Sequence, residues 1–236
     1  MRANLPKPIR RACSDMTSLT KFQNRSEAGQ LLGERLGYLT SERPVVLGLP
    51  RGGVPVAFEV AQALASPLDV LVVRKLGVPF HPELAFGAIS EDDTQVLNTQ
   101  LVQRLGLSKV TIAEVARHER AELIRRVEFY RGDRAALALI GRTVVIVDDG
   151  LATGATARVA VEVARARGAK RIIVAVPVSP REAVAELRAV ADEVISLYVP
   201  TQFEAVGEWY EDFNQTTDDE VTSLLRKSSN TDQLSH

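Results

Sequence analysis

The sequence predicts an α/β fold built on a mainly parallel sheet. Short runs that are apolar at nearly every residue alternate along the chain with amphipathic segments. That alternation is typical of a parallel sheet whose two faces are both covered by helices. The chain has 236 residues, of which 45% are hydrophobic and 25% are charged. It therefore suits one such domain with a small additional lobe.

The two ends of the chain are predicted to be flexible tails around a folded domain of residues 21–226. Residues 1–20 contain prolines and scattered charge without periodicity, and residues 227–236 are almost entirely polar. Segments of this composition bury too little apolar surface to order themselves.

The domain is expected to begin with a helix, a strand and a second helix. Ser26 suits an N-cap, and leucines follow it at helical spacing, at positions 31, 32, 36 and 39. The apolar run of residues 45–49 is a short buried strand. A turn through residues 50–53 leads into a helix over residues 54–65.

The middle of the chain is expected to hold a strand, a loop and one long helix. A second apolar run covers residues 70–73 and ends at Arg74 and Lys75, and glycine and prolines mark a loop before residues 84–89. Residues 108–131 keep a rhythm of 3.6 residues among many charges, which predicts an amphipathic helix. That helix packs on the core or mediates self-association.

The last part of the domain continues the alternation of strands and helices. Residues 143–147 are a predicted strand, and the helix that follows ends near Gly168, because glycine suits a left-handed C-cap. Residues 172–176 and 194–199 are predicted strands, with a helix over residues 180–191 between them.

Composition and charge exclude several classes of protein. The chain has 29 basic and 30 acidic residues, a formal net charge of -1, so no basic field indicates a nucleic-acid partner. Cys13 is the only cysteine, and no spacing of cysteines or histidines indicates a structural metal site. No apolar run approaches the roughly 20 residues that span a bilayer. We therefore expect a cytoplasmic protein with no membrane partner.

The segment from Val144 to Thr156, VVIVDDGLATGAT, carries the strongest chemical signal. A buried strand delivers Asp148 and Asp149 to the carboxyl edge of the sheet, where open α/β sheets bind ligands. The first amides of the following helix, residues 153–156, are a cradle for a phosphate. Carboxylates beside that cradle are expected to face a different group, such as the vicinal hydroxyls of a ribose.

These thirteen residues resemble the phosphoribosyl pyrophosphate (PRPP) signature of type I phosphoribosyltransferases, in which apolar residues precede an acidic pair and a Thr-Gly-x-Thr-like loop. The resemblance implies a mainly parallel five-stranded sheet flanked by helices, with a small hood subdomain. Gly150 departs from it, because the family usually has an aliphatic residue there. The hood is expected from the C-terminal region together with the N-terminal helix.

Three further segments resemble the same family in the right order. Residues 49–53, LPRGG, are similar to its pyrophosphate loop, and residues 73–77, VRKLG, to the start of its flexible catalytic loop. Residues 199–213 are loosely similar to the base-binding hood of 6-oxopurine enzymes. Residues 176–179 contain no lysine where those enzymes carry one, so the resemblance leaves the acceptor base open.

The resemblance implies transfer of a 5-phosphoribosyl group from PRPP to a nitrogenous base with release of pyrophosphate. Mg²⁺ is then bound through the substrate, with no direct metal ligand from the chain. The implied site has four parts. Asp148, Asp149, Arg74 and Lys75 are catalytic; Gly150, Leu151, Ala152, Thr153, Gly154, Ala155 and Thr156 bind the 5′-phosphate; Arg51, Gly52 and Gly53 bind pyrophosphate; and Phe203 stacks on the base.

Two other functional classes remain open on the sequence. A regulator could bind PRPP without turning it over, although the net charge of -1 gives no sign of the basic face that binds RNA or DNA. A generic nucleotide-binding domain is the other, although neither Gly-x-x-x-x-Gly-Lys-Ser/Thr nor Gly-x-Gly-x-x-Gly occurs. A homodimer is compatible with each of these functional classes and with the transferase.

Overall fold

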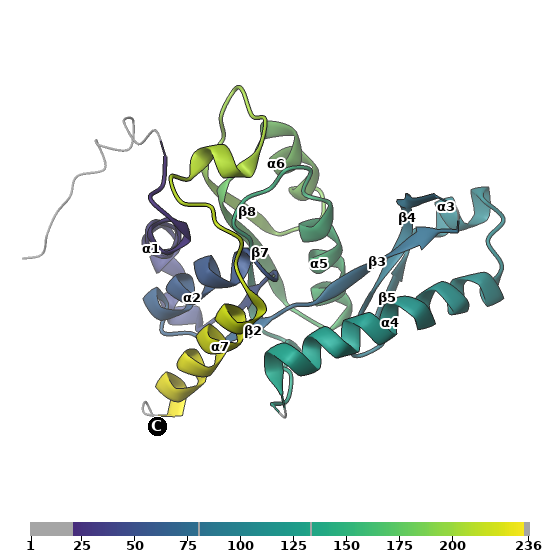
Figure 1. Cartoon of the computed structure of the whole chain (residues 1–236), viewed down its shortest axis with the longest axis horizontal. Coiled ribbons are helices and arrows are strands. Elements are labelled where there is room, and N and C mark those ends of the chain that lie inside the picture. The colour runs from purple at the N-terminus through teal and green to yellow at the C-terminus, as the bar shows by residue number, and fades with distance from the viewer. Residues whose placement is uncertain (1–20, 80, 133, 234–236) are drawn as a thin grey trace, which may run out of the picture.

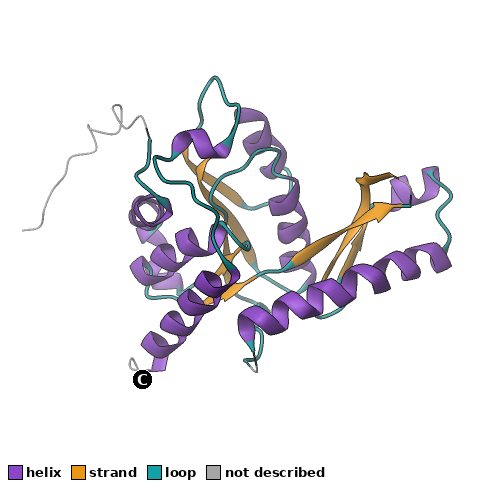
Figure 2. Cartoon of the chain, viewed as in Figure 1, coloured by secondary structure: helices purple, strands orange, loops and turns teal. Residues whose placement is uncertain are grey.

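The computed structural model describes residues 21–79, 81–132 and 134–233. The predicted N-terminal tail, residues 1–20, and Cys13 lie outside the described residues. Two sheets organise the chain, one parallel and one antiparallel (Figures 1 and 2). The predicted α/β class with a mainly parallel five-stranded sheet is confirmed.

The main sheet has five parallel strands. In spatial order they are β2 (Leu68–Val70), β1 (Val45–Gly48), β6 (Thr143–Val147), β7 (Arg171–Val178) and β8 (Glu193–Tyr198). Val46 lies opposite Val145, and Val145 lies opposite Ile173. Nearly all side chains of β1, β6 and β7 are buried because helices cover both faces of the sheet, which explains the long apolar runs in these strands.

Helices α1 (Arg25–Arg35), α2 (Gly53–Ala63) and α7 (Asp218–Gln233) lie on one face of this sheet, and α5 (Ala155–Ala166) and α6 (Arg181–Leu187) lie on the other. Alternate residues of one strand separate the two cores: Val145 and Val147 pack with α2, whereas Val144 and Ile146 pack with α5. A short 3-10 helix, η1 (Gly37–Glu42), joins α1 to β1.

The N-cap of the first helix differs from the prediction. α1 begins at Arg25, and the Asn24 side chain accepts a hydrogen bond from the Glu27 amide at 3.0 Å. Asn24 has extended backbone angles and so can cap, which leaves Ser26 inside the first turn.

A second, antiparallel sheet projects from the body as an arm (Figure 1). It consists of β3 (Val73–Val78), β4 (His81–Ser90) and β5 (Gln95–Leu97), followed by α3 (Thr99–Arg104) and α4 (Lys109–Arg131). The long helix predicted at residues 108–131 is confirmed, with Ser108 as its N-cap. α4 covers the second sheet and also contacts α7.

The strand predicted at residues 70–73 is wrong. β2 ends at Val70, the chain leaves the main sheet through Leu71 and Val72, and β3 starts at Val73 in the other sheet. Leu71 and Val72 are buried, so the apolar run is continuous although the strand is not. Arg74 and Lys75 consequently lie within a strand and not in a loop.

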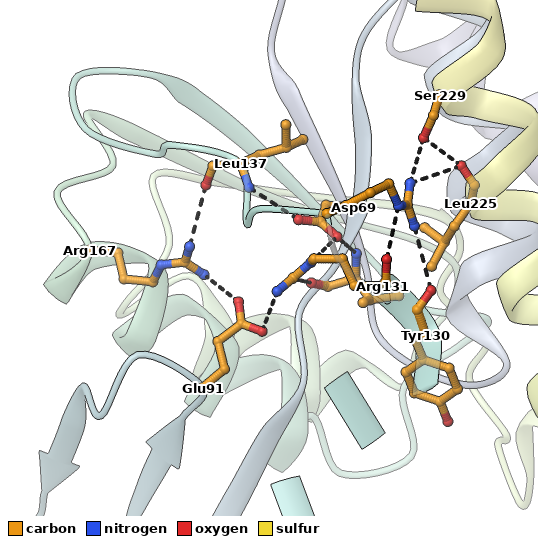
Figure 3. Close-up of polar contacts among 10 residues, drawn as sticks. Asp69, Glu91, Tyr130, Arg131, Leu137, Arg167, Leu225 and Ser229 are labelled. Carbon is orange, nitrogen blue, oxygen red and sulfur yellow. Dashed lines mark hydrogen bonds and ion pairs between the residues drawn. The ribbon is translucent and has the colours of Figure 1, made fainter. Parts of the chain in front are cut away.

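A buried ion-pair network joins the arm to the body (Figure 3). Arg131, the last residue of α4, donates to Asp69 of β2 at 3.1 Å and to Glu91 at 2.6 Å. Arg167, directly after α5, faces Glu91 from the other side at 3.6 Å. Asp69 also accepts a hydrogen bond from the Leu137 amide. Residues from the body and from the arm therefore share one buried charge cluster.

The C-terminal tail predicted from residue 227 is helical up to Gln233. Leu225 is buried, and Arg134 donates hydrogen bonds to the Leu225 carbonyl and to the Ser229 hydroxyl (Figure 3). A polar segment can continue a helix when the turns before it are buried and another part of the chain donates hydrogen bonds to it. The composition of the segment gave no sign of these contacts.

Candidate active site

The acidic pair lies where β6 ends, at the carboxyl edge of the main sheet. Asp148 Oδ1 accepts a hydrogen bond from the Asp149 amide at 2.9 Å, and Asp149 Oδ2 accepts one from Arg25 Nε at 2.8 Å. The other oxygen of each carboxylate has no hydrogen-bond partner among the described residues, and neither of these oxygens is sealed from solvent. The pair thus presents two adjacent free acceptors.

The protonation of the pair is set by burial and by mutual repulsion. Burial raises the pKa of Asp148 well above its usual range, and the neighbouring Asp149 charge raises it further. Burial also raises the pKa of Asp149, while the Arg25 guanidinium lowers it. Two ionised carboxylates are therefore costly without a ligand, and a ligand that donates hydrogen bonds to both favours the ionised form.

The predicted pyrophosphate loop lies directly over these acids. A Cβ atom at Gly52 would collide with the Asp149 carboxylate, and one at Gly53 would lie 2.6 Å from the Val147 carbonyl oxygen. Only glycine allows this approach. The peptide bond between Pro50 and Arg51 is cis. The structure therefore brings Arg51, Gly52 and Gly53 together with the acidic pair.

The predicted phosphate cradle opens helix α5. Gly154 caps the helix without a side-chain hydrogen bond. Among the described residues no carbonyl accepts from the amides of Thr153, Gly154 or Thr156, and the Ala155 amide has only the Thr153 hydroxyl at 3.4 Å. Unpaired amides at the positive end of a helix dipole suit an anion.

Gly150, the departure from the family pattern, has a packing reason in this fold. Gly150 follows β6 and lies between the end of β7 and the 3-10 helix η2 (Val206–Trp209). A Cβ atom there would lie 2.5 Å from Val206 Cγ1 and 3.1 Å from Val178 Cγ1. An aliphatic side chain at this position would displace Val206. The glycine lets the hood pack closely on the acidic turn.

We expect the substitution Gly150→Ala to lower the free energy of unfolding by about 1–3 kcal/mol, because overpacking at a filled site forces its neighbours to shift. Chemical denaturation measures the change. Gly37→Ala is the matched control, since a Cβ atom there meets nothing within 4 Å. Equal stability of the two variants would contradict this packing.

The hood is a small aromatic core joined to the N-terminal segment. Phe22 and Tyr210 form an isolated parallel bridge, and the Phe22 ring contacts the rings of Tyr198 and Tyr210. Tyr198 also stacks on Trp209. The Tyr210 hydroxyl donates to the Asp149 carbonyl oxygen at 2.6 Å. The hood is therefore tied directly to the acidic turn.

Phe203, the predicted base-stacking residue, lies apart from this aromatic core. It lines a cavity of about 360 Å³ together with residues from the start of α6, Pro180, Arg181 and Glu182. α6 also borders the phosphate cradle, because Ala183 lies beside Gly154. The structure places Phe203 near the cradle and gives it no contact with the acids.

Arg74 and Lys75 are not brought to the acidic pair. Arg74 forms an ion pair with Glu119 of α4 at 2.6 Å. Both residues line a cavity of about 710 Å³ between β3 and α4, in the arm. Their catalytic role stays a prediction that requires the arm to bring them to the site.

Arg25 is the site residue that sequence reasoning missed. It belongs to the first turn of α1, and 124 positions separate it from Asp149. No local pattern marks it, because an arginine in the first turn of a helix is unremarkable by itself. Only the folding of the N-terminal segment onto the hood brings it to the acids.

Fold and site together define an α/β protein with an acidic pair and a set of unpaired helix amides at one edge of a parallel sheet. The chain belongs to the phosphoribosyl transferase domain family, whose pattern it matches over residues 23–212.

The similar proteins include both curated sequences and a solved structure. The chain is 54% identical over 207 residues to a Mycobacterium tuberculosis protein, from strains H37Rv and CDC 1551, that is named provisionally as a phosphoribosyl transferase. The match covers 88% of this chain and 47% of that protein, so the chain spans about half the length of the curated relatives it matches. The crystal structure of TT1426 from Thermus thermophilus is 46% identical, covers 88% of this chain and 98% of that one, and superposes with a TM-score of 0.82.

Two further features bear on partners. No described helix has the length and apolar character needed to cross a membrane. Within the described residues, no group of three or more histidine, cysteine, aspartate or glutamate side chains is arranged to hold a metal ion.

Proposed function

We propose that the chain transfers the 5-phosphoribosyl group of PRPP to a nitrogen of a base and releases pyrophosphate. One observation carries the proposal: two adjacent carboxylates, each with one free oxygen, lie beside the unpaired amides that open α5. The spacing of these groups along one turn suits a ribose 5-phosphate, whose 2′- and 3′-hydroxyls donate while its phosphate accepts. Membership of the phosphoribosyl transferase domain family supports it.

In this proposal the chain itself provides no covalent nucleophile. The bond between C1 of the ribose and the pyrophosphate oxygen breaks, pyrophosphate leaves with the electron pair, and a bond from the base nitrogen to C1 forms. The base nitrogen then loses its proton to solvent. Asp148 and Asp149 hold the hydroxyls and stabilise positive charge on the ribose ring, so catalysis comes from orientation and electrostatics.

The pyrophosphate is expected beside the loop of Arg51, Gly52 and Gly53. The Arg51 guanidinium is 3.9 Å from Asp218, and both side chains are more than a third exposed. Such an ion pair is weak, so the guanidinium is available to an incoming pyrophosphate. Gly52 and Gly53, which lie against the acids, let that anion approach the backbone.

Mg²⁺ fits this site as a partner of the substrate. The described residues offer no three-ligand cluster, whereas magnesium commonly binds phosphate oxygens and water with one or two carboxylates. When bound, the ion would neutralise charge on the leaving pyrophosphate. In this proposal Asp148 and Asp149 hold the ribose, and the ion would be placed through the substrate's oxygens and not by direct ligands from the chain.

The proposal is tested by pyrophosphate release. The protein is incubated with PRPP, Mg²⁺ and a panel of purine and pyrimidine bases. A double variant that carries both Asp148→Asn and Asp149→Asn is measured alongside. The matched control is Asp219→Asn, an exposed carboxylate in the first turn of α7. We expect release that depends on one base and is lost in the double variant but not in the control.

PRPP binding without release, for every base, would overturn the transferase proposal and favour the PRPP-binding regulator. Neither binding nor release would overturn both.

A further inference from the structure

Arg25 connects the acidic pair to the hood through three contacts. Its Nε donates to Asp149 Oδ2 at 2.8 Å, and its Nη1 donates to the Asn214 carbonyl oxygen at 2.7 Å. Its guanidinium lies over the Phe213 ring, 4.0 Å from the centroid. The side chains of Arg25 and Asp149 are only 12% and 14% exposed, so this is a built contact and not a chance surface pair.

The geometry leaves each partner one orientation. A guanidinium is planar, and a bond from Nε, a bond from Nη1 and a stacked ring fix its plane. The Asp149 carboxylate accepts this bond through Oδ2, which leaves Oδ1 for another donor. Oδ1 of Asp149 is the oxygen that has no protein partner among the described residues.

We propose that Arg25 is a positioning residue of the phosphoribosyl site, which fixes the Asp149 carboxylate for a ribose hydroxyl and joins that carboxylate to the hood. The inference rests on the proposed function, because it assigns the ribose to the acidic pair. Arg25 itself touches no substrate atom in this account and acts through Asp149.

The charges around Asp149 make Arg25 the group on which its ionisation depends. Asp148 precedes it and repels its charge, and the Tyr210 hydroxyl is already engaged with the Asp149 carbonyl oxygen. Gly52 lies against the carboxylate without any charge. Burial raises the pKa of Asp149 and the Arg25 guanidinium lowers it, so removal of the guanidinium raises that pKa further.

The loop and the last helix do not replace this cation. Arg51, in the loop over the acids, forms its ion pair with Asp218 at the start of α7. Asp218 also accepts a hydrogen bond from Tyr130 of the arm. In the described part of the chain, Arg25 is the positively charged side chain that contacts the Asp149 carboxylate.

The test measures the affinity for PRPP with Mg²⁺ by calorimetry between pH 6 and pH 9 in the wild type and in Arg25→Met and Arg25→Lys. Arg25→Met is expected to lose about tenfold in affinity near neutral pH, since each unit of raised pKa changes the ionised fraction roughly tenfold below it. The loss is expected to shrink as pH rises and Asp149 ionises. Arg25→Lys keeps a cation but loses the planar contacts, so it is expected to recover the part of the loss that depends on pH and not the rest.

Arg35→Met is the matched control, because it removes an exposed arginine from the last turn of the same helix. It is expected to leave affinity unchanged at every pH. Circular dichroism checks that each variant is folded, and if Arg25→Met is not, the comparison of Arg25→Lys with Arg25→Gln gives the same readout.

The outcomes separate this inference from the proposed function. If the wild type does not bind PRPP, the proposed function fails and the role of Arg25 fails with it. If the wild type binds and the loss in Arg25→Met is the same at all pH values, or lysine gives no recovery, then Arg25 is merely structural and only this inference is overturned.

Discussion

Replacing Asp148 by asparagine is expected to weaken PRPP binding by about 10- to 100-fold while raising the melting temperature. The variant loses a charge-assisted hydrogen bond to a ribose hydroxyl, a contribution of about 1.5–3 kcal/mol. It also loses a buried carboxylate whose pKa burial and Asp149 raise well above the usual range. About 1 kcal/mol moves the midpoint by roughly 2–4 °C in a chain of this size, so a rise of a few degrees is expected.

The two effects depend on pH with definite signs. A carboxyl group whose pKa is raised by folding stabilises the fold while it is protonated, and that contribution is lost as pH rises through the folded-state pKa. The melting-temperature advantage of Asp148→Asn over the wild type should therefore grow as pH rises. The affinity of the wild type for PRPP should fall as pH is lowered, because the hydroxyls need an ionised acceptor.

Calorimetric titration and thermal melting at several pH values measure both effects. A variant that loses both binding and stability would contradict the account, because it would mean that Asp148 holds the fold together and is not strained by its burial.

Replacing Arg131 by methionine is expected to cost about 3–5 kcal/mol of unfolding free energy, the usual loss when one partner of a buried ion pair is removed. Arg131 is 7% exposed, and Asp69 and Glu91 depend on it for their charge balance. Arg167 still faces Glu91 at 3.6 Å, but Asp69 would lose the guanidinium with which it pairs. Denaturant unfolding measures the loss.

The arm should be the region that responds first to this change, because Arg131 joins α4 to β2 (Figure 3). Hydrogen exchange is expected to accelerate in β3, β4 and β5 before it does so in the main sheet. Arg125→Met is the control. Arg125 forms an exposed ion pair with Glu122 on the same helix, so its replacement should leave the unfolding free energy almost unchanged. Similar losses in both variants would refute the network as the anchor of the arm.

Elements with a clear periodicity could be predicted from the sequence. The central strands β1, β6 and β7 are apolar at nearly every residue because both faces of the sheet are covered, and α4 shows its amphipathic pattern over 23 residues. An error arose where the apolar run was continuous but the strand was not. Leu71 and Val72 are apolar like their neighbours, yet the chain changes sheets there, and a residue's hydrophobicity does not report which sheet it enters.

The acidic pair and the unpaired amides that open α5 could be placed from the sequence because they form one contiguous segment between a strand and a helix. Gly52 and Gly53 could be placed at the same edge because they follow β1, which pairs with β6. Arg25 and Tyr210 could not be placed at the site from the sequence. They contact Asp149 because the N-terminal segment and the hood fold together, as the bridge between Phe22 and Tyr210 shows. The helix beyond residue 227 was missed for a similar reason, since Arg134, from another part of the chain, donates hydrogen bonds to Leu225 and Ser229 of that helix.

The central claim is that the acids hold the ribose while the first amides of α5 hold the 5′-phosphate. Backbone amide chemical shifts during titration of the wild type with PRPP and Mg²⁺ test it most directly. We expect the largest shifts at Thr153, Gly154, Ala155 and Thr156, followed by Asp149. Shifts confined to other regions, such as the cavity between β3 and α4 that Arg74 lines, would contradict it.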